Sequence, residues 1–169
     1  VANVETFDGS SWTEVGDTNT ARTNGAAAGE SSTAALLFGG ATPSSTANTE
    51  SWNGSSWTEV NNLSTALQEQ GGLGASTLAL SFGGNTGSVV ASTEEWSFPS
   101  TPVVQLGQVW FNTGSATLKG YAAQGTGAWA SSGNLNTARY MGGGSGTQIA
   151  ALMAGGGPGT PAHSEQYNG

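Results

Sequence analysis

The chain is short, acidic and poor in charged residues. Its 169 residues include 28 glycines and no cysteine, and 11 acidic against 3 basic side chains give a formal net charge of −8. Binding to nucleic acid or to an anionic membrane surface needs clustered lysine and arginine side chains. The composition therefore excludes both partners, and the absence of cysteine excludes disulfide and thiolate–metal scaffolds.

Membrane-spanning and targeting segments are not expected either. No apolar run approaches the roughly 18 residues of a membrane-spanning helix, so we expect no membrane insertion. The chain begins at Val1 without a basic segment, so we expect a signal peptide to be absent or already removed.

A short phrase, a glutamate followed two residues later by an aromatic residue, recurs along the chain. It occupies 5–7, 50–52, 94–96 and 165–167, at intervals of 45, 44 and 71 residues. Three tryptophans keep the same phase, ten residues before an arginine or a leucine: Trp12 before Arg22, Trp57 before Leu67 and Trp129 before Arg139. A period of about 40 to 50 residues is typical of stacked or circular repeats, whose units cannot bury a core alone.

In chain order, each unit predicts short antiparallel strands. The Asp8-Gly9 dipeptide after the first phrase favours a hairpin with a type I′ turn, in which both central residues have positive φ. The strand after this turn contains Trp12. The apolar run 34–38 is too short for a helix and predicts a buried strand that ends at Gly39-Gly40, where positive φ is easily adopted. The corresponding runs are 78–82 and 149–153. The predicted fold class is therefore all-β.

Other structures also fit part of this pattern. The Gly, Ser, Thr and Asn content is compatible with a flexible low-complexity segment, and the same strands would build a sandwich or a solenoid. Six tryptophans, most of them in phase with the repeat, argue against disorder because disordered chains contain few aromatic residues.

The order of these features resembles the kelch motif: a buried strand ending in Gly-Gly, then Glu-x-aromatic and Asp/Asn-Gly, then Trp, then a polar stretch that reaches Arg. The resemblance covers nearly all of 5–98 and 129–169, although the aromatic residue varies and Leu67 replaces one arginine. It implies a kelch-like β-propeller with blades of four antiparallel strands. We expect about three blades, as part of a larger or multi-chain propeller, because propellers usually have about four to eight. The lysine-poor, Ser/Thr/Asn-rich composition is also similar to kelch-like repeats in structural proteins of marine bacteriophages.

The positions of the phrases set the expected repeat boundaries. The first, second and third repeats are expected at 1–49, 50–93 and 94–164, and a fourth, truncated repeat begins at 165–169. Both ends lie inside a repeat. We therefore expect either a fragment of a longer polypeptide, which we prefer, or several chains that close a ring together.

The third repeat contains an insertion of about 28 residues at its hairpin turn, at about 99–128. The inserted sequence predicts a separate hairpin and resembles a short element common in phage tail and fibre proteins. The hairpin either pads a neighbouring blade or subunit, or projects as a recognition loop. The candidate residues for ligand or partner binding are Trp110, Phe111, Asn112, Lys119 and Tyr121.

The sequence predicts no catalytic, metal or cofactor site. His163 is the only histidine and lies in a turn-like segment, where we expect it to be solvated. One histidine without cysteine builds no His/Cys metal cluster, and no nucleophile motif accompanies it. We therefore expect that the chain is not an enzyme.

The four phrase glutamates recur in phase, which indicates a repeated structural role. They are Glu5, Glu50, Glu94 and Glu165. Arg22 and Arg139 are also in phase, so we expect glutamate–arginine contacts within or between blades. Because Leu67 takes the arginine position of the second unit, charge reversal of Glu50 is expected to cost less stability than charge reversal of Glu165.

Taken with these features, the resemblance to phage structural proteins implies a non-enzymatic structural or adhesion module of a phage virion, in a tail, fibre or surface protein, that contributes to host attachment. Its location would be the virion or an extracellular surface, and its partners other protein subunits of the same assembly and cell-surface glycans. The alternative is an extracellular carbohydrate-binding propeller of a bacterial surface or secreted protein. A hydrolase or lyase propeller is a third hypothesis, which the missing site chemistry opposes.

Overall fold

The computed structural model describes residues 1–97, 109–112, 117–120, 127–159 and 163–168. Within these residues the chain forms fifteen β-strands and no helix, so the predicted all-β class is confirmed. The described part of the chain accordingly has no helix that could cross a membrane. In chain order the strands are β1 (Glu5–Phe7), β2 (Trp12–Glu14), β3 (Ala26–Ser31), β4 (Ala34–Phe38), β5 (Thr49–Trp52), β6 (Trp57–Val60), β7 (Gly71–Ala75), β8 (Leu78–Phe82), β9 (Thr93–Ser97), β10 (Val109–Asn112), β11 (Thr117–Gly120), β12 (Ala128–Ser131), β13 (Gly143–Thr147), β14 (Ala150–Ala154) and β15 (Ser164–Tyr167).

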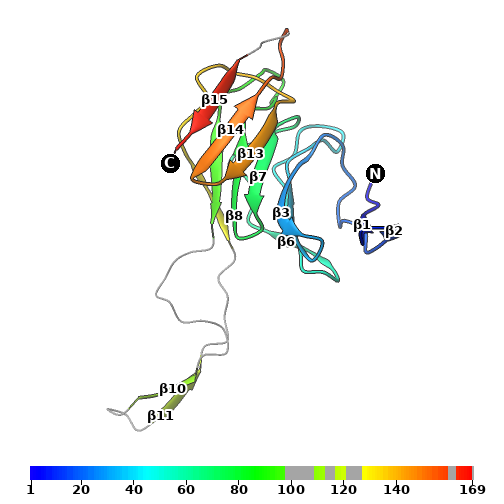
Figure 1. The fold of residues 1–169 in the computed structure, drawn as a ribbon, viewed down its shortest axis with the longest axis vertical. Helices are drawn as coiled ribbons and strands as arrows, with labels where there is room; N and C mark the ends of the chain where they lie inside the picture. Colours follow the sequence, from blue (N-terminus) through cyan, green and yellow to red (C-terminus); the bar gives the residue numbers. More distant parts are fainter. Residues whose placement is uncertain (98–108, 113–116, 121–126, 160–162, 169) are drawn as a thin grey trace.

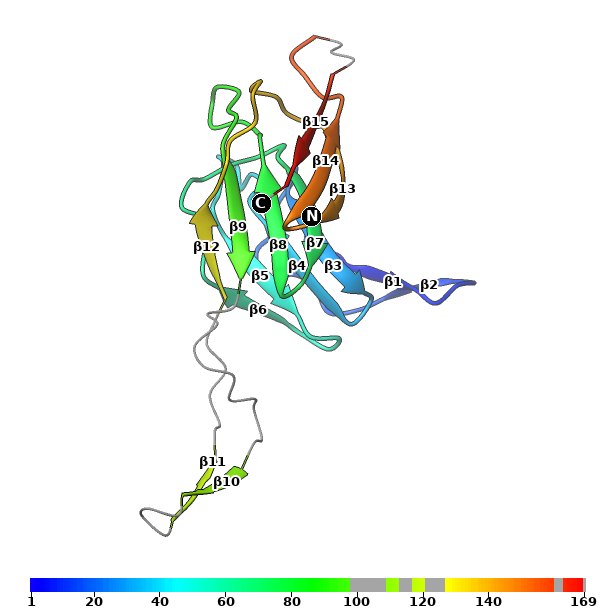
Figure 2. The ribbon, with the colours of Figure 1, turned by 60° about the vertical axis from the view of Figure 1, so that its left-hand side comes forward.

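Three antiparallel sheets form the body of the structure (Figures 1 and 2). Sheet I has the strand order β3-β4-β5-β6, sheet II the order β7-β8-β9-β12, and sheet III the order β13-β14-β15. Two hairpins, β1–β2 and β10–β11, form separate two-stranded sheets. Sheets I and II each take their first two strands from one sequence repeat and their last two from the next.

The apolar runs form the second strand of each sheet. Strands β4 and β8 have the predicted bounds, and β14 begins and ends one residue later than the predicted run 149–153. The paired glycines after β4 have positive φ, with 63° at Gly39 and 101° at Gly40. This part of the prediction is confirmed.

The hairpin turn after the first phrase is present, but its predicted type I′ conformation is wrong. Gly9 has a φ of 102°, whereas Asp8 does not have positive φ. Instead, the Asp8 carboxylate accepts hydrogen bonds from the backbone N–H groups of Ser10 and Ser11, at 2.8 and 2.9 Å. The hydrogen bonds from Ser11 and Ser10 lower the pKa of Asp8 to about 2. The aspartate side chain therefore closes this turn as an Asx turn does.

The first strands of the three sheets lie beside one another, with β7 contacting both β3 and β13. A series of backbone hydrogen bonds joins the segments that lead into them: Glu69 N–H donates to the Asn24 carbonyl, and Met141 N–H to the Glu69 carbonyl, both at 2.9 Å. Asn24, Glu69 and Met141 have φ of 55°, 60° and 54°. Residues other than glycine rarely adopt this conformation, so its recurrence at one repeat position indicates a shared linking role.

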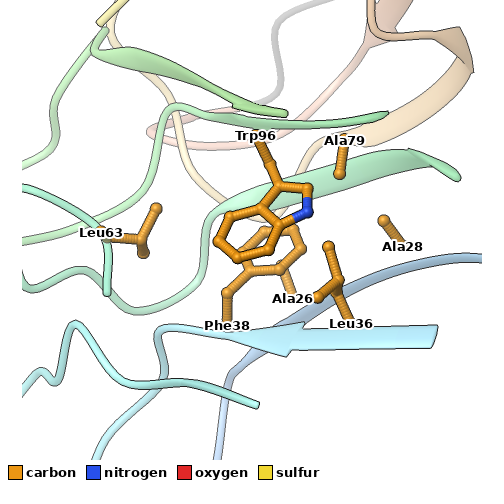
Figure 3. Close-up of a cluster of buried hydrophobic side chains, with 7 residues drawn as sticks. All are labelled: Ala26, Ala28, Leu36, Phe38, Leu63, Ala79 and Trp96. Atoms are coloured by element: carbon orange, nitrogen blue, oxygen red, sulfur yellow. The ribbon is translucent and has the colours of Figure 1, made fainter. Parts of the chain in front are cut away.

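Apolar side chains cover both faces of sheet II. The cluster between sheets I and II contains Phe38 and Trp96 (Figure 3). Trp129 of β12 packs against it, with its ring centroid 4.9 Å from that of Phe38. The cluster between sheets II and III contains Phe82 and Met153. Sheet II is thus the middle layer of the structure.

Both clusters depend on a close approach between a phenylalanine ring and a glycine. A Cβ atom added to Gly72 on β7 would lie 2.7 Å from Cζ of Phe38. A Cβ atom added to Gly144 on β13 would lie 2.5 Å from Cζ of Phe82. A glycine inside a strand often marks such a close approach, and here it allows each ring to lie directly against the next sheet.

The substitution Gly72→Ala is expected to destabilise the fold by about 1 to 3 kcal/mol, although alanine usually suits a strand better than glycine. The new Cβ would have to displace the Phe38 ring or the Ala27 carbonyl, which lies 2.8 Å from its position. Thermal melts measure the loss. Gly16→Ala is the matched control because its Cβ would have no neighbour closer than 3.5 Å. Equal melting temperatures for the two variants would contradict the close approach.

Candidate functional site

A buried ion pair joins β5 to the segment that precedes β3. Arg22 Nη2 donates to Glu50 Oε1, and the two side chains are only 3% and 1% exposed. Glu50 also accepts the backbone N–H groups of Asn19, at 2.7 Å, and Thr20, at 3.2 Å. Arg22 Nη1 donates to the Asn48 carbonyl oxygen at 2.7 Å. Each charge therefore has an opposite charge and further hydrogen bonds, which a buried ion pair needs.

Sheet III contains the same arrangement. Arg139 Nη2 donates to Glu165 Oε1, and Arg139 Nη1 donates to the His163 carbonyl oxygen at 3.1 Å. Asn136 N–H donates to Glu165 Oε2 at 2.6 Å. Burial alone would raise the pKa of Glu165, but the Asn136 hydrogen bonds and the Arg139 charge outweigh burial and hold this pKa below its usual range. The predicted glutamate–arginine contact is confirmed for these two glutamates.

The premise of the predicted ranking, that Glu50 has no arginine partner, is wrong, because each arginine pairs with the glutamate of the following repeat. Glu50 has its arginine, and Glu94 is the glutamate that follows Leu67. Glu94 is 3% exposed and accepts the Ser64 N–H at 2.9 Å. The described residues contain no ion pair at Glu94. The second unit therefore combines a buried leucine with a buried carboxylate that binds backbone.

Glu5 differs from the other three glutamates. It is exposed, and residues 1–97 contain no ion pair with it. Of the strands that the structure describes, β1 pairs with β2 alone, whereas β5, β9 and β15 lie in sheets I, II and III.

Sequence reasoning missed a polar cluster that joins sheets II and III. The hydroxyls of Tyr167 and Ser132 each donate to Oε1 of Glu95, and the two hydroxyls are also within hydrogen-bonding reach of each other. The hydrogen bond to Glu95 raises the pKa of Tyr167 above its ordinary value. Ser51 and Gln166 take the position of Glu95 in sheets I and III. Only this departure from the repeat could have signalled the cluster.

A small cavity of about 50 Å³ adjoins this cluster. Its walls include Phe82, Leu135, Met153, Glu165 and Tyr167. The space can hold water but is far below the roughly 300 Å³ or more of a small-molecule pocket. It is a packing gap between two sheets.

The inserted hairpin, β10–β11, lies apart from the three sheets (Figures 1 and 2). β10 and β11 pair antiparallel, so the predicted hairpin is present. Its register sets three pairs of residues opposite each other: Trp110 and Lys119, Phe111 and Leu118, and Asn112 and Thr117. The structure thus brings four of the five predicted binding residues into one hairpin, while Tyr121 lies outside the described residues.

His163 is exposed, as predicted. Its contact with Arg139 is through the backbone carbonyl oxygen. The part of the chain that the structure describes contains no group of three or more His, Asp or Glu side chains that could hold a metal ion.

The substitution Glu50→Gln is expected to cost about 3 to 5 kcal/mol of stability, because it leaves the Arg22 charge buried without a partner. Glu94→Gln is the matched control, since it removes a carboxylate that has no ion pair among the described residues. We expect it to cost clearly less. Chemical denaturation of both variants measures the difference. Equal losses would show that the Arg22 ion pair contributes nothing specific.

No protein-family model and no curated protein matches this chain. The kelch-like resemblance therefore stays a prediction from the residues.

Proposed function

We propose that sheets I, II and III are kelch-like blades of a β-propeller, and that the chain is a non-enzymatic structural or adhesion module of a phage virion. The observation that supports the blade arrangement best is the contact of β7 with both β3 and β13, the first strands of successive sheets. In a propeller, four-stranded sheets are arranged radially with their first strands around a centre. The backbone link through Asn24, Glu69 and Met141 supports the same arrangement, because one kind of contact recurs between successive units.

The positions of the three basic residues support a scaffold with one recognition element. Of the three lysine and arginine residues, Arg22 and Arg139 are committed to buried ion pairs. The third, Lys119, lies opposite Trp110 on the inserted hairpin. Lys119 is therefore the one of these three basic residues outside the ion pairs, and the backbone register of the inserted hairpin sets it opposite an aromatic residue.

The virion role rests on the similarity of the repeats and of the inserted hairpin to phage structural proteins. The proposed partners are other protein subunits of the same assembly, and the proposed location is the virion or an extracellular surface.

Virions purified on a density gradient are expected to contain the protein at a constant ratio to the major capsid protein across the particle peak. Quantitative mass spectrometry of the gradient fractions measures this ratio, and membranes of uninfected host cells are the control. Recovery of the protein only from non-viral cell-surface fractions would rule out the virion role.

The inserted hairpin is the proposed contact with the host surface. Trp110 supplies a large apolar face, Lys119 a charge and Asn112 an amide that can donate and accept hydrogen bonds. Long insertions on a rigid scaffold are frequent places for binding residues.

The substitution Trp110→Ala is expected to weaken binding of the labelled protein to host cells about tenfold or more, because buried aromatic anchors dominate interface energies. Flow cytometry over a concentration series measures this. Trp12→Ala is the matched control, since Trp12 is 66% exposed on β2, outside the hairpin. If Trp110→Ala binds host cells as tightly as the wild-type protein, the hairpin is not the contact with the host surface.

A carbohydrate-binding propeller of a bacterial surface or secreted protein is the second candidate. The same hairpin favours it, because sugar rings stack on aromatic faces and amide groups such as that of Asn112 hydrogen-bond hydroxyls. A glycan array separates the candidates: specific hits for a protein that is absent from virions favour the second, and an array without hits opposes it.

A further inference from the structure

Neighbouring sheets meet through two faces of different kinds. We call the face of a sheet that packs on the next sheet along the chain its forward face, and the opposite face its rear face. The forward face contains a phenylalanine from the second strand, Phe38 in sheet I and Phe82 in sheet II. The rear face of the next sheet presents a glycine from its first strand, Gly72 in sheet II and Gly144 in sheet III. The packing therefore has a direction, from each unit to the next.

One forward face and one rear face have no sheet against them among the described residues. The forward face of sheet III contains Ala154 and Leu152, which is 49% exposed. The rear face of sheet I contains Ala27, Ala35 and Leu37, which line an open groove of about 430 Å³.

The residues on these two faces match in size. Ala154 takes the position of the two phenylalanines, and Ala27 takes the position of the two glycines. A Cβ at the glycine position collides with a phenylalanine ring, as the 2.7 Å approach at Gly72 demonstrates. Where the ring is missing, a methyl group fits. Ala154 and Ala27, the two exceptions to the phenylalanine–glycine pattern, thus lie on the two open faces. The smaller side chain of Ala154 leaves room for the methyl group of Ala27.

The β1–β2 hairpin lies beside the groove in the position of a sheet's outer strands. Arg22 N–H donates to the Val1 carbonyl at 3.1 Å, as Leu67 N–H donates to the Thr46 carbonyl at 3.2 Å. The segment before β1 therefore contacts the segment that leads into β3 as the segment before β5 contacts the segment that leads into β7. Yet none of the described strands lies on the second edge of β1, whereas β5 pairs with β4 and β9 with β8.

The residues of β1 lack the contacts that their counterparts have. Phe7 is 48% exposed, while Trp52 and Trp96 at the same repeat position are 5% and 0% exposed. Glu5 is exposed, while Glu50 is buried against an arginine. Among the described residues, Phe7 has no strand on the second side of β1, and Glu5 has no arginine partner.

We propose that a second copy of this chain fills the groove with its β13–β14 strands. Its β14 pairs with β1, and its forward face, with Ala154, packs on Ala27. In the docked sheet β1–β2 takes the place of the second copy's β15, so Glu5 pairs with that copy's Arg139 in place of Glu165. β15 can leave because it is an edge strand whose Glu165 is 12% exposed, against 1% for Glu50. The exchange replaces one edge strand by a two-stranded hairpin and covers Phe7.

This contact is head-to-tail, because a forward face meets a rear face. Such contacts close into rings when the rotation between copies permits. The inference rests on the proposed blade arrangement and is independent of the virion role.

Sedimentation velocity of the 169-residue chain tests the docking. We expect assemblies of two or more copies above the 16.8 kDa monomer. Ala154→Phe is expected to return the chain to monomer, because the new ring would meet the Ala27 methyl group. The double variant Ala27→Gly/Ala154→Phe is expected to restore assembly, because it recreates the Phe38–Gly72 pair. Leu152→Glu is expected to prevent assembly, while Ile149→Glu, 66% exposed in the turn before β14, leaves it intact.

Thermal melts of every variant separate lost docking from lost folding. If Ala154→Phe does not fold, Leu152→Glu against Ile149→Glu decides. A wild-type chain that melts cooperatively but stays monomeric overturns the docking. This result does not bear on the virion role, which the gradient experiment tests separately. Assembly that survives both Ala154→Phe and Leu152→Glu, or that the double variant fails to restore, also overturns it.

Discussion

The contact on which the rest of the structure depends is a phenylalanine ring lying against a glycine of the next sheet. Gly72 and Gly144 leave room for Phe38 and Phe82, so the first strands of successive sheets can lie beside one another. Close packing of this kind leaves little freedom in the distance between layers. The two apolar clusters and the covered position of sheet II follow from it.

The ion pairs perform a different task, since they fix loops to strands. Arg22 and Glu50 together bind backbone groups on both sides of the pair, and Arg139 and Glu165 repeat this arrangement. A buried ion pair specifies geometry more than it adds stability. The unit with Leu67 shows that an apolar side chain can take the arginine position when the carboxylate keeps its backbone donor.

Much of the fold could be predicted because each position in the repeat can be compared with its counterparts in the other units. The β4 and β8 strands, the paired glycines and the glutamate–arginine contact all follow from phase. Phase does not say which unit an arginine faces, so the expectation that Glu50 lacks an arginine partner is wrong. The predicted type I′ conformation of the turn at Asp8 is wrong because the Asp8 side chain closes the loop by hydrogen bonds, without a positive backbone φ. The cluster at Glu95 does not repeat, so phase gives no sign of it. The role of the hairpin residues does not follow from the fold either, because one fold hosts many functions.

The links between successive units at Asn24, Glu69 and Met141 are made by backbone atoms, and the three side chains have nothing in common. This backbone link sets no requirement on the side chain at its own position when a gene gains or loses a unit by duplication or deletion, so the side-chain requirement at a new junction lies in the phenylalanine–glycine contact. Neighbouring units are then free to diverge in sequence while the chain keeps its path. We expect the number of units to change more easily in evolution than the backbone link between them.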